Sequence, residues 1–223
     1  MSLLEAIVMG IIQGLTEFLP ISSTAHLFAI PQLLGWGDRG SAFSAVIQLG
    51  TLVAVMVFFW ADIVRLLRAW WVDVSTFRYG TSHDAKLAWM IAVGTIPIVA
   101  CGLAFQKYIK ADLRNLTVVA WAAIVFTLLL LTAELVAHRR GKSGDDGRSE
   151  AAIGWRDVLI IGLFQALALI PGASRSGVTI TGGLFVGLSR STAARFSFLL
   201  SLPAVFGAGV KEQIGRASCR ERV

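Results

Sequence analysis

The sequence has few charged residues. Only 15% of its 223 residues are Asp, Glu, Lys or Arg, whereas 56% are hydrophobic, and the mean hydropathy is +0.71. Soluble domains are nearer one quarter charged, because their surfaces face water. The apolar residues gather in runs of about 20, the length that crosses a bilayer core of about 30 Å. The composition therefore excludes an ordinary soluble domain and predicts an all-α polytopic membrane protein.

Cysteine is also scarce. The two cysteines, Cys101 and Cys219, provide neither a disulfide framework nor a paired-cysteine zinc pattern. Cys101 lies in an apolar run, where a small buried side chain is expected. The net charge of +6 could indicate nucleic acid, but most Lys and Arg lie in short segments between apolar runs. Such segments orient a membrane protein, so no nucleic-acid partner is expected.

Four apolar runs predict membrane spans, at about residues 42–60, 87–106, 116–137 and 192–211. Positive charge differs between the segments that connect them. Segments 61–86 and 138–156 together hold nine Lys and Arg residues. The alternate loops hold four: Arg39, Lys107, Lys110 and Arg114. The positive-inside rule places the first two segments in the cytoplasm. The end of the polar stretch GLTEFLPISSTAH (14–26) then faces the outside.

Two further apolar stretches, 3–30 and 155–188, are each interrupted by one of only five prolines, Pro20 and Pro171. Each proline is followed by hydroxyls or glycines. Irregular backbone at membrane depth is tolerated only where it is buried in protein or lines a wet cavity. The pattern therefore predicts two broken, re-entrant helical hairpins.

The two broken stretches resemble each other. GIIQGLTEFLPISS (10–23) and GLFQALALIPGAS (162–174) share Gly-x-x-Gln, an apolar stretch, and Pro with Ser three residues later. Because three spans separate the copies, they enter the membrane in opposite senses. Inverted repeats of this kind bind ligands where their discontinuous helices meet. Chance similarity between apolar segments is the alternative.

The repeat predicts a division of the chain. Residues 1–137 form a first repeat with a hairpin and three spans, 138–154 form a cytoplasmic linker, and 155–213 form a second repeat that lacks its last two helices. Residues 214–223, IGRASCRERV, end the apolar pattern abruptly and resemble the translation of a common sequencing adapter. A non-native tail is therefore predicted, with a genuine basic terminus as the alternative. No functional role is therefore expected for five side chains of this tail: Arg216, Cys219, Arg220, Glu221 and Arg222.

The first break carries an unusual set of polar residues. An ionisable group inside a membrane is costly and marks a functional candidate. Glu17 follows Gln13 by four residues, so both share one helix face. After Pro20 come four more polar side chains, Ser22, Ser23, Thr24 and His26. As alternatives, the hydroxyls could satisfy backbone freed by the proline, and Glu17 could be a structural pairing partner.

The second break reads PGASRSG, residues 171–177. Arg175 lies between Ser174 and Ser176, and its planar guanidinium suits phosphate oxygens. Gly172 lets the backbone approach a ligand closely, and hydroxyls with amides at a helix start extend an anion site. Arg175 could instead only neutralise Glu17 across the repeat interface.

Together these groups suit hydrolysis of a phosphate ester or diphosphate on a lipid. Arg175 would stabilise the transferring phosphoryl group. Glu17 could hold a hard divalent cation, whose ligands are carboxylate and phosphate oxygens, or act as a general base. A hydroxyl beside such a base is a plausible nucleophile. No Walker A loop is present, since Val136 stands where the glycine before GKS would be needed.

QGLTEFLPISSTAHL and PGASRSG closely resemble the two signature segments of the bacterial undecaprenyl-diphosphate phosphatases, the bacitracin-resistance family. The resemblance covers essentially residues 1–213. It implies removal of the terminal phosphate of undecaprenyl diphosphate, which recycles the lipid carrier of peptidoglycan synthesis. It also implies dependence on a divalent cation (Mg²⁺ or Ca²⁺), an inverted repeat in the plasma (inner) membrane, and a site open to the outer face. The oligomeric state is left open, a homodimer included.

The resemblance also implies roles for residues. The family's motif glutamate, serine and histidine match Glu17, Ser23 and His26, and its phosphate-binding Ser-Arg pair matches Ser174 and Arg175. The resulting catalytic set is Glu17, Ser23, His26 and Arg175, with phosphate bound by Ser22, Thr24, Ser174, Arg175, Ser176 and Gly172. Ser23 is the preferred nucleophile and His26 the second choice.

One residue departs from the family pattern. Many members have a second glutamate where this chain has Gln13, so a two-carboxylate metal site cannot be assumed, and Glu17 with Gln13 is the expected metal set. A transporter or flippase of a polyprenyl phosphate is the alternative function, because broken inverted repeats typify transporters. The acid-phosphatase-like membrane enzymes are excluded, because none of their three motifs is present.

Overall fold

The structure, a computed structural model, consists of helices joined by turns and loops in the part of the chain that it describes, with no β-strand there. The described residues are 2–36, 40–106, 108, 113, 115–140 and 147–220. Five of the basic residues counted for orientation lie outside them: Arg39, Lys107, Lys110, Arg114 and Lys142. So do Glu221 and Arg222 of the predicted tail.

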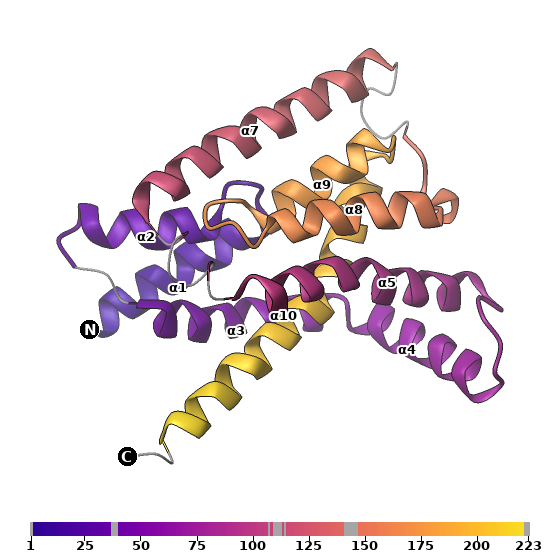
Figure 1. The fold of residues 1–223 in the computed structure, drawn as a ribbon, viewed down its shortest axis with the longest axis horizontal. Helices are drawn as coiled ribbons and strands as arrows, with labels where there is room; N and C mark the ends of the chain where they lie inside the picture. Colours follow the sequence, from indigo (N-terminus) through magenta and orange to yellow (C-terminus); the bar gives the residue numbers. More distant parts are fainter. Residues whose placement is uncertain are drawn as a thin grey trace.

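The described helices follow one another along the chain with short connections (Figure 1). They are α1 (Leu3–Phe18), α2 (Ser23–Leu33), α3 (Gly40–Phe58), α4 (Trp60–Ser75), α5 (His83–Ala104), α7 (Leu116–Arg139), the 3₁₀ turn η1 (Glu150–Ala152), α8 (Trp155–Leu167), α9 (Arg175–Phe185) and α10 (Arg190–Arg220).

Most helix starts have a polar cap. Ser2, Ser22, Ser82 and Ser174 accept a backbone N–H through their hydroxyls, and Asn115 does so through its amide oxygen. Each cap satisfies one of the amides that the first turn of a helix leaves without a partner. The caps therefore fix where helices begin along a largely apolar chain.

The predicted spans are confirmed, with one change. Among the described residues, α5, α7 and the part of α10 from Arg190 to Gly209 are each long and apolar enough to cross a membrane. The run predicted as a span at 42–60 meets that test only together with α4, from which it is bent by 75°. Segment 61–86, treated as a connecting segment in the sequence, contains this additional amphipathic helix.

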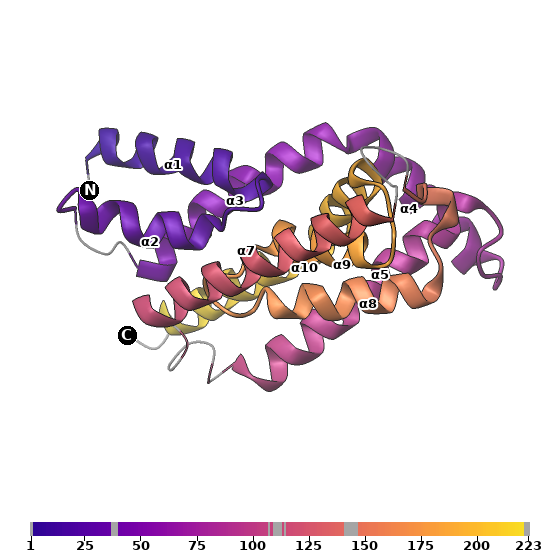
Figure 2. The same cartoon turned by 90° about the horizontal axis from the view of Figure 1, so that it is seen from above.

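Both predicted helical hairpins are present. The chain leaves helical geometry between α1 and α2, and again between α8 and α9, at Pro20 and Pro171. Figures 1 and 2 show the two hairpins extending towards opposite ends of the molecule, with their breaks meeting near its middle. This arrangement is the one that an inverted repeat requires.

The core lies where α8 and α10 pack against α5. Val158, Phe196 and Leu200 have essentially no exposed surface. Close approach of α8 to α5 depends on Gly162, where an added Cβ would lie 2.6 Å from the carbonyl oxygen of Gly94. This packed centre holds the second hairpin rigidly against the spans.

Candidate active site

The two helix breaks touch each other. The Ser176 hydroxyl, at the start of α9, donates to the carbonyl oxygen of Leu19 in the first break at 3.2 Å. An added Cβ at Gly177 would lie 3.4 Å from the Pro20 ring, so the two segments approach each other closely at this point. Backbone that the first break frees from helical hydrogen bonds is thus satisfied by the second repeat.

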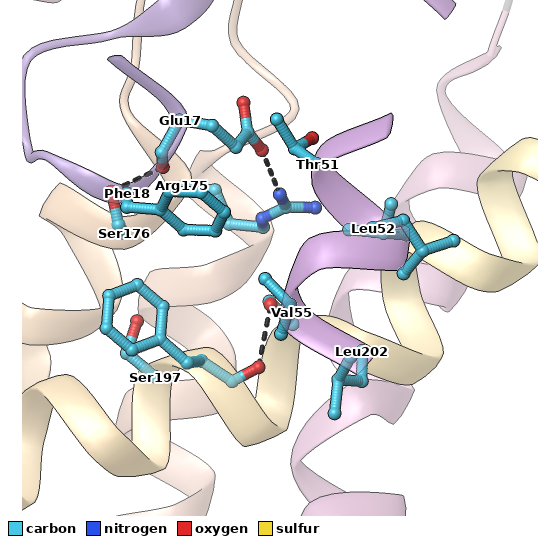
Figure 3. A pocket seen from close by; sticks show the side chains of 12 residues that line it. Glu17, Phe18, Thr51, Leu52, Val55, Arg175, Ser176, Ser197 and Leu202 are labelled. Atoms are coloured by element: carbon cyan, nitrogen blue, oxygen red, sulfur yellow. Dashed lines mark hydrogen bonds and ion pairs between the residues drawn. The ribbon is translucent and has the colours of Figure 1, made fainter. Parts of the chain in front are cut away.

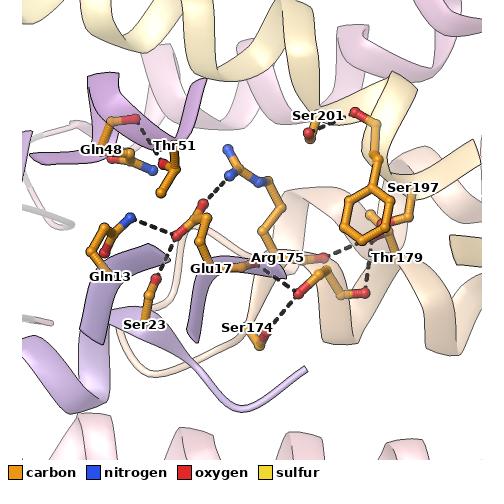
Figure 4. Close-up of polar contacts among 12 residues, drawn as sticks. Gln13, Glu17, Ser23, Gln48, Thr51, Ser174, Arg175, Thr179, Ser197 and Ser201 are labelled. Carbon is orange, nitrogen blue, oxygen red and sulfur yellow. Dashed lines mark hydrogen bonds and ion pairs between the residues drawn. The ribbon is translucent and has the colours of Figure 1, made fainter. Parts of the chain in front are cut away.

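Glu17 stands at the centre of the junction (Figure 4). Its Oε2 accepts from the Gln13 amide at 3.0 Å and from the Ser23 hydroxyl at 2.6 Å. Its Oε1 accepts from the Arg175 guanidinium, with which it forms an ion pair between the repeats. The Glu17 side chain is 9% exposed. A buried carboxylate requires this pairing and hydrogen bonding to stay charged.

Arg175 begins α9 and points its guanidinium towards Glu17 from the second repeat. Within the described part of the chain, Glu17 is the one acceptor of its N–H groups. A guanidinium carries five N–H donors in a planar fork. The remaining donors are therefore available to oxygens of a bound anion.

The serines beside Arg175 shape the second break. Ser174 caps α9 by accepting from the Gly177 amide at 3.2 Å, and its hydroxyl lies 3.1 Å from that of Ser176. Both side chains are buried. They hold the start of α9, and thereby Arg175, in place.

The structure separates the polar residues after the first break. Ser22 is buried, has a φ of +61° and caps α2 by accepting from the Ala25 amide. The ring nitrogen Nδ1 of His26 lies 2.8 Å from the Ser22 carbonyl oxygen. Thr24 is exposed. Of these residues, only Ser23 contacts Glu17 in the described structure.

Gly172 has a packing role that the sequence did not indicate. Its φ is +96°, and an added Cβ would lie 2.4 Å from the carbonyl oxygen of Val119 on α7. The close approach that this glycine permits is therefore to α7. It also lines a separate small cavity beside Ser22 and Ser174.

A small open cavity, with about 20 Å³ of space for the centres of water-sized molecules, adjoins the Glu17–Arg175 pair (Figure 3). One end is polar, and the walls farther from Glu17 are apolar. The apolar lining residues are Phe18, Leu52, Val55, Phe198, Leu202 and Val205. The lining thus places charged and hydroxyl groups next to apolar side chains, the combination that a charged head on an apolar chain would contact.

Sequence reasoning missed three hydroxyls of this cavity. Thr51 comes from α3, and Ser197 and Ser201 come from α10. The signal was present, since Ser197 and Ser201 are four residues apart in an apolar span and so share one helix face. They went unnoticed because they lie far in the sequence from both breaks.

The site has one carboxylate and few other metal ligands. No group of three or more His, Cys, Asp or Glu that could hold a metal ion occurs among the described residues. However, the buried amide oxygen of Gln13 has no hydrogen-bond partner in the described structure, and it belongs to the side chain whose nitrogen contacts Glu17. An orphaned buried acceptor beside a carboxylate suits a hard cation that takes its other ligands from phosphate and water.

The repeat is unequal at this position. Gln165, the counterpart of Gln13, is fully buried, and neither atom of its amide has a partner in the part of the chain that the structure describes. The residue four positions later is Leu169, where the first copy has Glu17. The first repeat therefore supplies the carboxylate, and the second supplies the arginine.

These features define a polytopic membrane protein with a buried carboxylate–arginine site at the junction of two broken hairpins. Comparison with known proteins then specifies the family. Residues 6–222 match the family model described as bacitracin resistance protein BacA, and the chain belongs to this family. The match includes most of the predicted tail, whose foreign origin stays a prediction.

Curated relatives agree with this assignment. An undecaprenyl-diphosphatase of Chlorobium phaeovibrioides (strain DSM 265 / 1930) is 55% identical over 210 residues, which are 94% of this chain and 74% of the relative. One of Chlorobaculum tepidum (strain ATCC 49652 / DSM 12025 / NBRC 103806 / TLS) is 55% identical over 212 residues, 95% of this chain and 75% of the relative. One of Chloroherpeton thalassium (strain ATCC 35110 / GB-78) is 53% identical over 210 residues, which are 94% of this chain and 74% of the relative.

Proposed function

We propose that this protein removes the terminal phosphate of undecaprenyl diphosphate and leaves undecaprenyl phosphate. The observation that carries the proposal is the Glu17–Arg175 pair at the polar end of an otherwise apolar cavity. The charged and hydroxyl groups suit a diphosphate chemically, and the apolar walls suit a polyprenyl chain. The names of the relatives support the same reaction.

Ser23 is the proposed nucleophile. Its hydroxyl donates to Glu17 at 2.6 Å, so the carboxylate can take the proton as the oxygen attacks the terminal phosphorus. The bond from that phosphorus to the bridging oxygen breaks, and undecaprenyl phosphate leaves. Water then releases inorganic phosphate from Ser23. His26, the second choice, lies one turn further along α2.

Arg175 is proposed to bind the terminal phosphate and to stabilise the charge that spreads over its oxygens during transfer. Ser174 and Ser176 hold the helix start that carries it. Support is weaker for three other predicted phosphate ligands. Ser22 caps α2, Thr24 is exposed, and Gly172 packs against α7.

A divalent cation, Mg²⁺ or Ca²⁺, is proposed as cofactor. Glu17 and the unpartnered amide oxygen of Gln13 would hold it together with phosphate oxygens of the substrate. The cation would neutralise negative charge on the diphosphate. The protein side chains would still orient the substrate and move the proton from Ser23 to Glu17.

The proposed location is the bacterial plasma (inner) membrane, with the site open to the outer face. The basic segments 61–86 and 138–156 would lie in the cytoplasm. Accessibility of a single cysteine introduced at Tyr79 to a membrane-impermeant thiol reagent would test this orientation. Labelling of Tyr79→Cys from the outside of intact cells would contradict it.

The decisive experiment measures phosphate release from undecaprenyl diphosphate in detergent. We expect Glu17→Gln and Arg175→Ala each to abolish release. The matched control is Glu134→Gln, because Glu134 forms an ion pair with Arg190 (2.9 Å) outside the cavity. A folded wild-type chain that releases no phosphate, or a Glu17→Gln variant that keeps wild-type activity, would contradict the proposal. Lipid translocation that persists in an inactive Glu17→Gln variant would instead favour a transporter.

Removal of the cation provides a second test. A chelator should abolish phosphate release, and added Mg²⁺ or Ca²⁺ should restore it. Gln13→Leu should raise the cation concentration that gives half-maximal activity, because it removes the amide oxygen. Equal activity with and without the chelator would exclude the proposed cofactor role.

A further inference from the structure

Two hydroxyls in the cavity have no part in the mechanism proposed above. Thr51 of α3 and Ser201 of α10 line the same cavity as Glu17 and Arg175. Figure 4 shows the Arg175 guanidinium between them. The third additional hydroxyl, Ser197, is 2% exposed and hydrogen-bonds to Thr179 between α10 and α9. Ser197 therefore joins helices, whereas Thr51 and Ser201 face the cavity.

Thr51 and Ser201 are not required by their own helices. Each donates to the carbonyl oxygen three residues earlier, Thr51 to Gln48 at 2.8 Å and Ser201 to Phe198 at 2.7 Å. Such local bonds add little to helix stability. A hydroxyl proton can turn from this weak bond to a charged phosphate oxygen, which is a stronger acceptor.

Their place along the cavity indicates which phosphate they meet. Figure 3 shows Thr51 beside the guanidinium, with Leu52, Val55 and Leu202 farther from Glu17. Ser201 directly precedes Leu202 on α10. The two hydroxyls thus lie where the polar end of the cavity meets its apolar walls.

We infer that Thr51 and Ser201 bind the phosphate that stays on the lipid, and so select a diphosphate joined to a polyprenyl chain. The inference rests on the proposed function and deepens it. The terminal phosphate lies against Glu17, Ser23 and Arg175. The lipid-linked phosphate accepts from the two hydroxyls beside the guanidinium, and the first isoprene units contact the apolar walls. The two helices that supply this subsite belong to different repeats.

Thr51→Val and Ser201→Ala test the inference, because they remove a hydroxyl with little change in volume. Each should raise KM for undecaprenyl diphosphate about tenfold, because the lost hydrogen bond to a charged group no longer holds the lipid-linked phosphate. Inhibition by undecaprenyl phosphate should weaken by a similar factor. Inhibition by inorganic phosphate should not change, because free phosphate uses the terminal site.

Two further variants are controls. Thr51→Ser keeps the hydroxyl and should restore wild-type KM. Thr132→Val removes an exposed α7 hydroxyl that makes the same kind of bond, to Leu129 at 2.7 Å, away from the cavity. Thermal unfolding in detergent identifies any variant that does not fold. The inference is overturned if folded Thr51→Val and Ser201→Ala both behave like Thr132→Val. It is also overturned if they weaken inhibition by inorganic phosphate as strongly as inhibition by undecaprenyl phosphate.

Direct binding of undecaprenyl phosphate separates this inference from the proposed function, because it needs no turnover. A wild-type chain that binds this lipid about tenfold more tightly than Thr51→Val, yet releases no phosphate, would support the subsite and contradict the hydrolase. A wild-type chain that hydrolyses the diphosphate while both variants bind undecaprenyl phosphate normally would support the hydrolase and overturn the subsite.

Discussion

At the scale of single residues, Glu17 is the group on which the site depends. Its two carboxylate oxygens are shared among an amide, a hydroxyl and a guanidinium from three different segments. Loss of one partner from a buried ion pair leaves an uncompensated charge and is strongly destabilising. The pair can therefore serve structure and chemistry together, as both alternatives for Arg175 in the sequence allowed.

Ser23→Ala should lower kcat by roughly 10⁶-fold, the loss seen when a serine hydrolase loses its nucleophile, because it removes the hydroxyl that attacks phosphorus and donates to Glu17. His26→Ala should have a smaller effect, since the described contact of its ring is with the Ser22 backbone. Single-turnover kinetics with trapping of a phosphorylated enzyme would compare the two. A phosphorylated histidine, or a larger loss in His26→Ala, would show that the nucleophile is His26.

At the scale of helices, the breaks are stabilised by contacts to other helices. The second break is held against α7 at Gly172 and against the first break through Ser176. The bend of 75° between the described end of α3 and α4 is also stabilised by packing, because Leu66 of α4 is buried in the core. A glycine at 172 is needed for both the left-handed backbone and the space.

Gly172→Ala should lower stability by about 1–3 kcal/mol, the cost of overpacking, because its Cβ would overlap the Val119 backbone at an unfavourable positive φ. Gly10→Ala on α1 is the matched control. No atom lies within 4 Å of an added Cβ there, and alanine favours helix. Thermal unfolding in detergent would show a lower Tm for Gly172→Ala alone; equal Tm values would contradict the packing role.

At the scale of the whole molecule, several contacts join the two repeats in the described structure, two of them on either side of the Phe18–Phe198 ring contact. One is the Glu17–Arg175 pair at the breaks. The other is Arg195 of α10, which donates to Asp62 of α4 at 2.7 Å and to Glu150 of η1 at 3.0 Å. Phe18, Phe59 and Phe198 pack between these points. The cavity is thus bounded by helices whose relative positions depend on both connections.

Arg195→Ala should lower the Tm in detergent, because Asp62 and Glu150 lose the cation that joins α4 and η1 to α10. The difference from wild type should shrink in 1 M salt, since these side chains are partly exposed and screening is strong there. Arg156→Ala, at an exposed position of α8, is the control. A Tm difference that does not depend on salt would assign the effect of Arg195 to packing.

The sequence alone determined the class of protein and most of its helices, whereas the roles of the site residues stay predictions. Runs of about 20 apolar residues reveal spans because lipid cannot hydrogen-bond to peptide groups, and Pro20 and Pro171 mark breaks because proline lacks an N–H. Polar residues at those breaks identified Glu17, Ser23 and Arg175. The domain boundaries and the non-native tail stay predictions.

Only the tertiary structure decided which polar groups meet. Thr51 and Ser201 line the cavity although their helices lie far from either motif in the sequence. Gly172 packs against α7, and Thr24 is exposed. The tertiary structure also turned the segment after α3 into a bent amphipathic helix. The physical reason is that periodicity along one helix reports which face is polar, but not which neighbour that face meets. That choice is made by packing between segments more than a hundred residues apart.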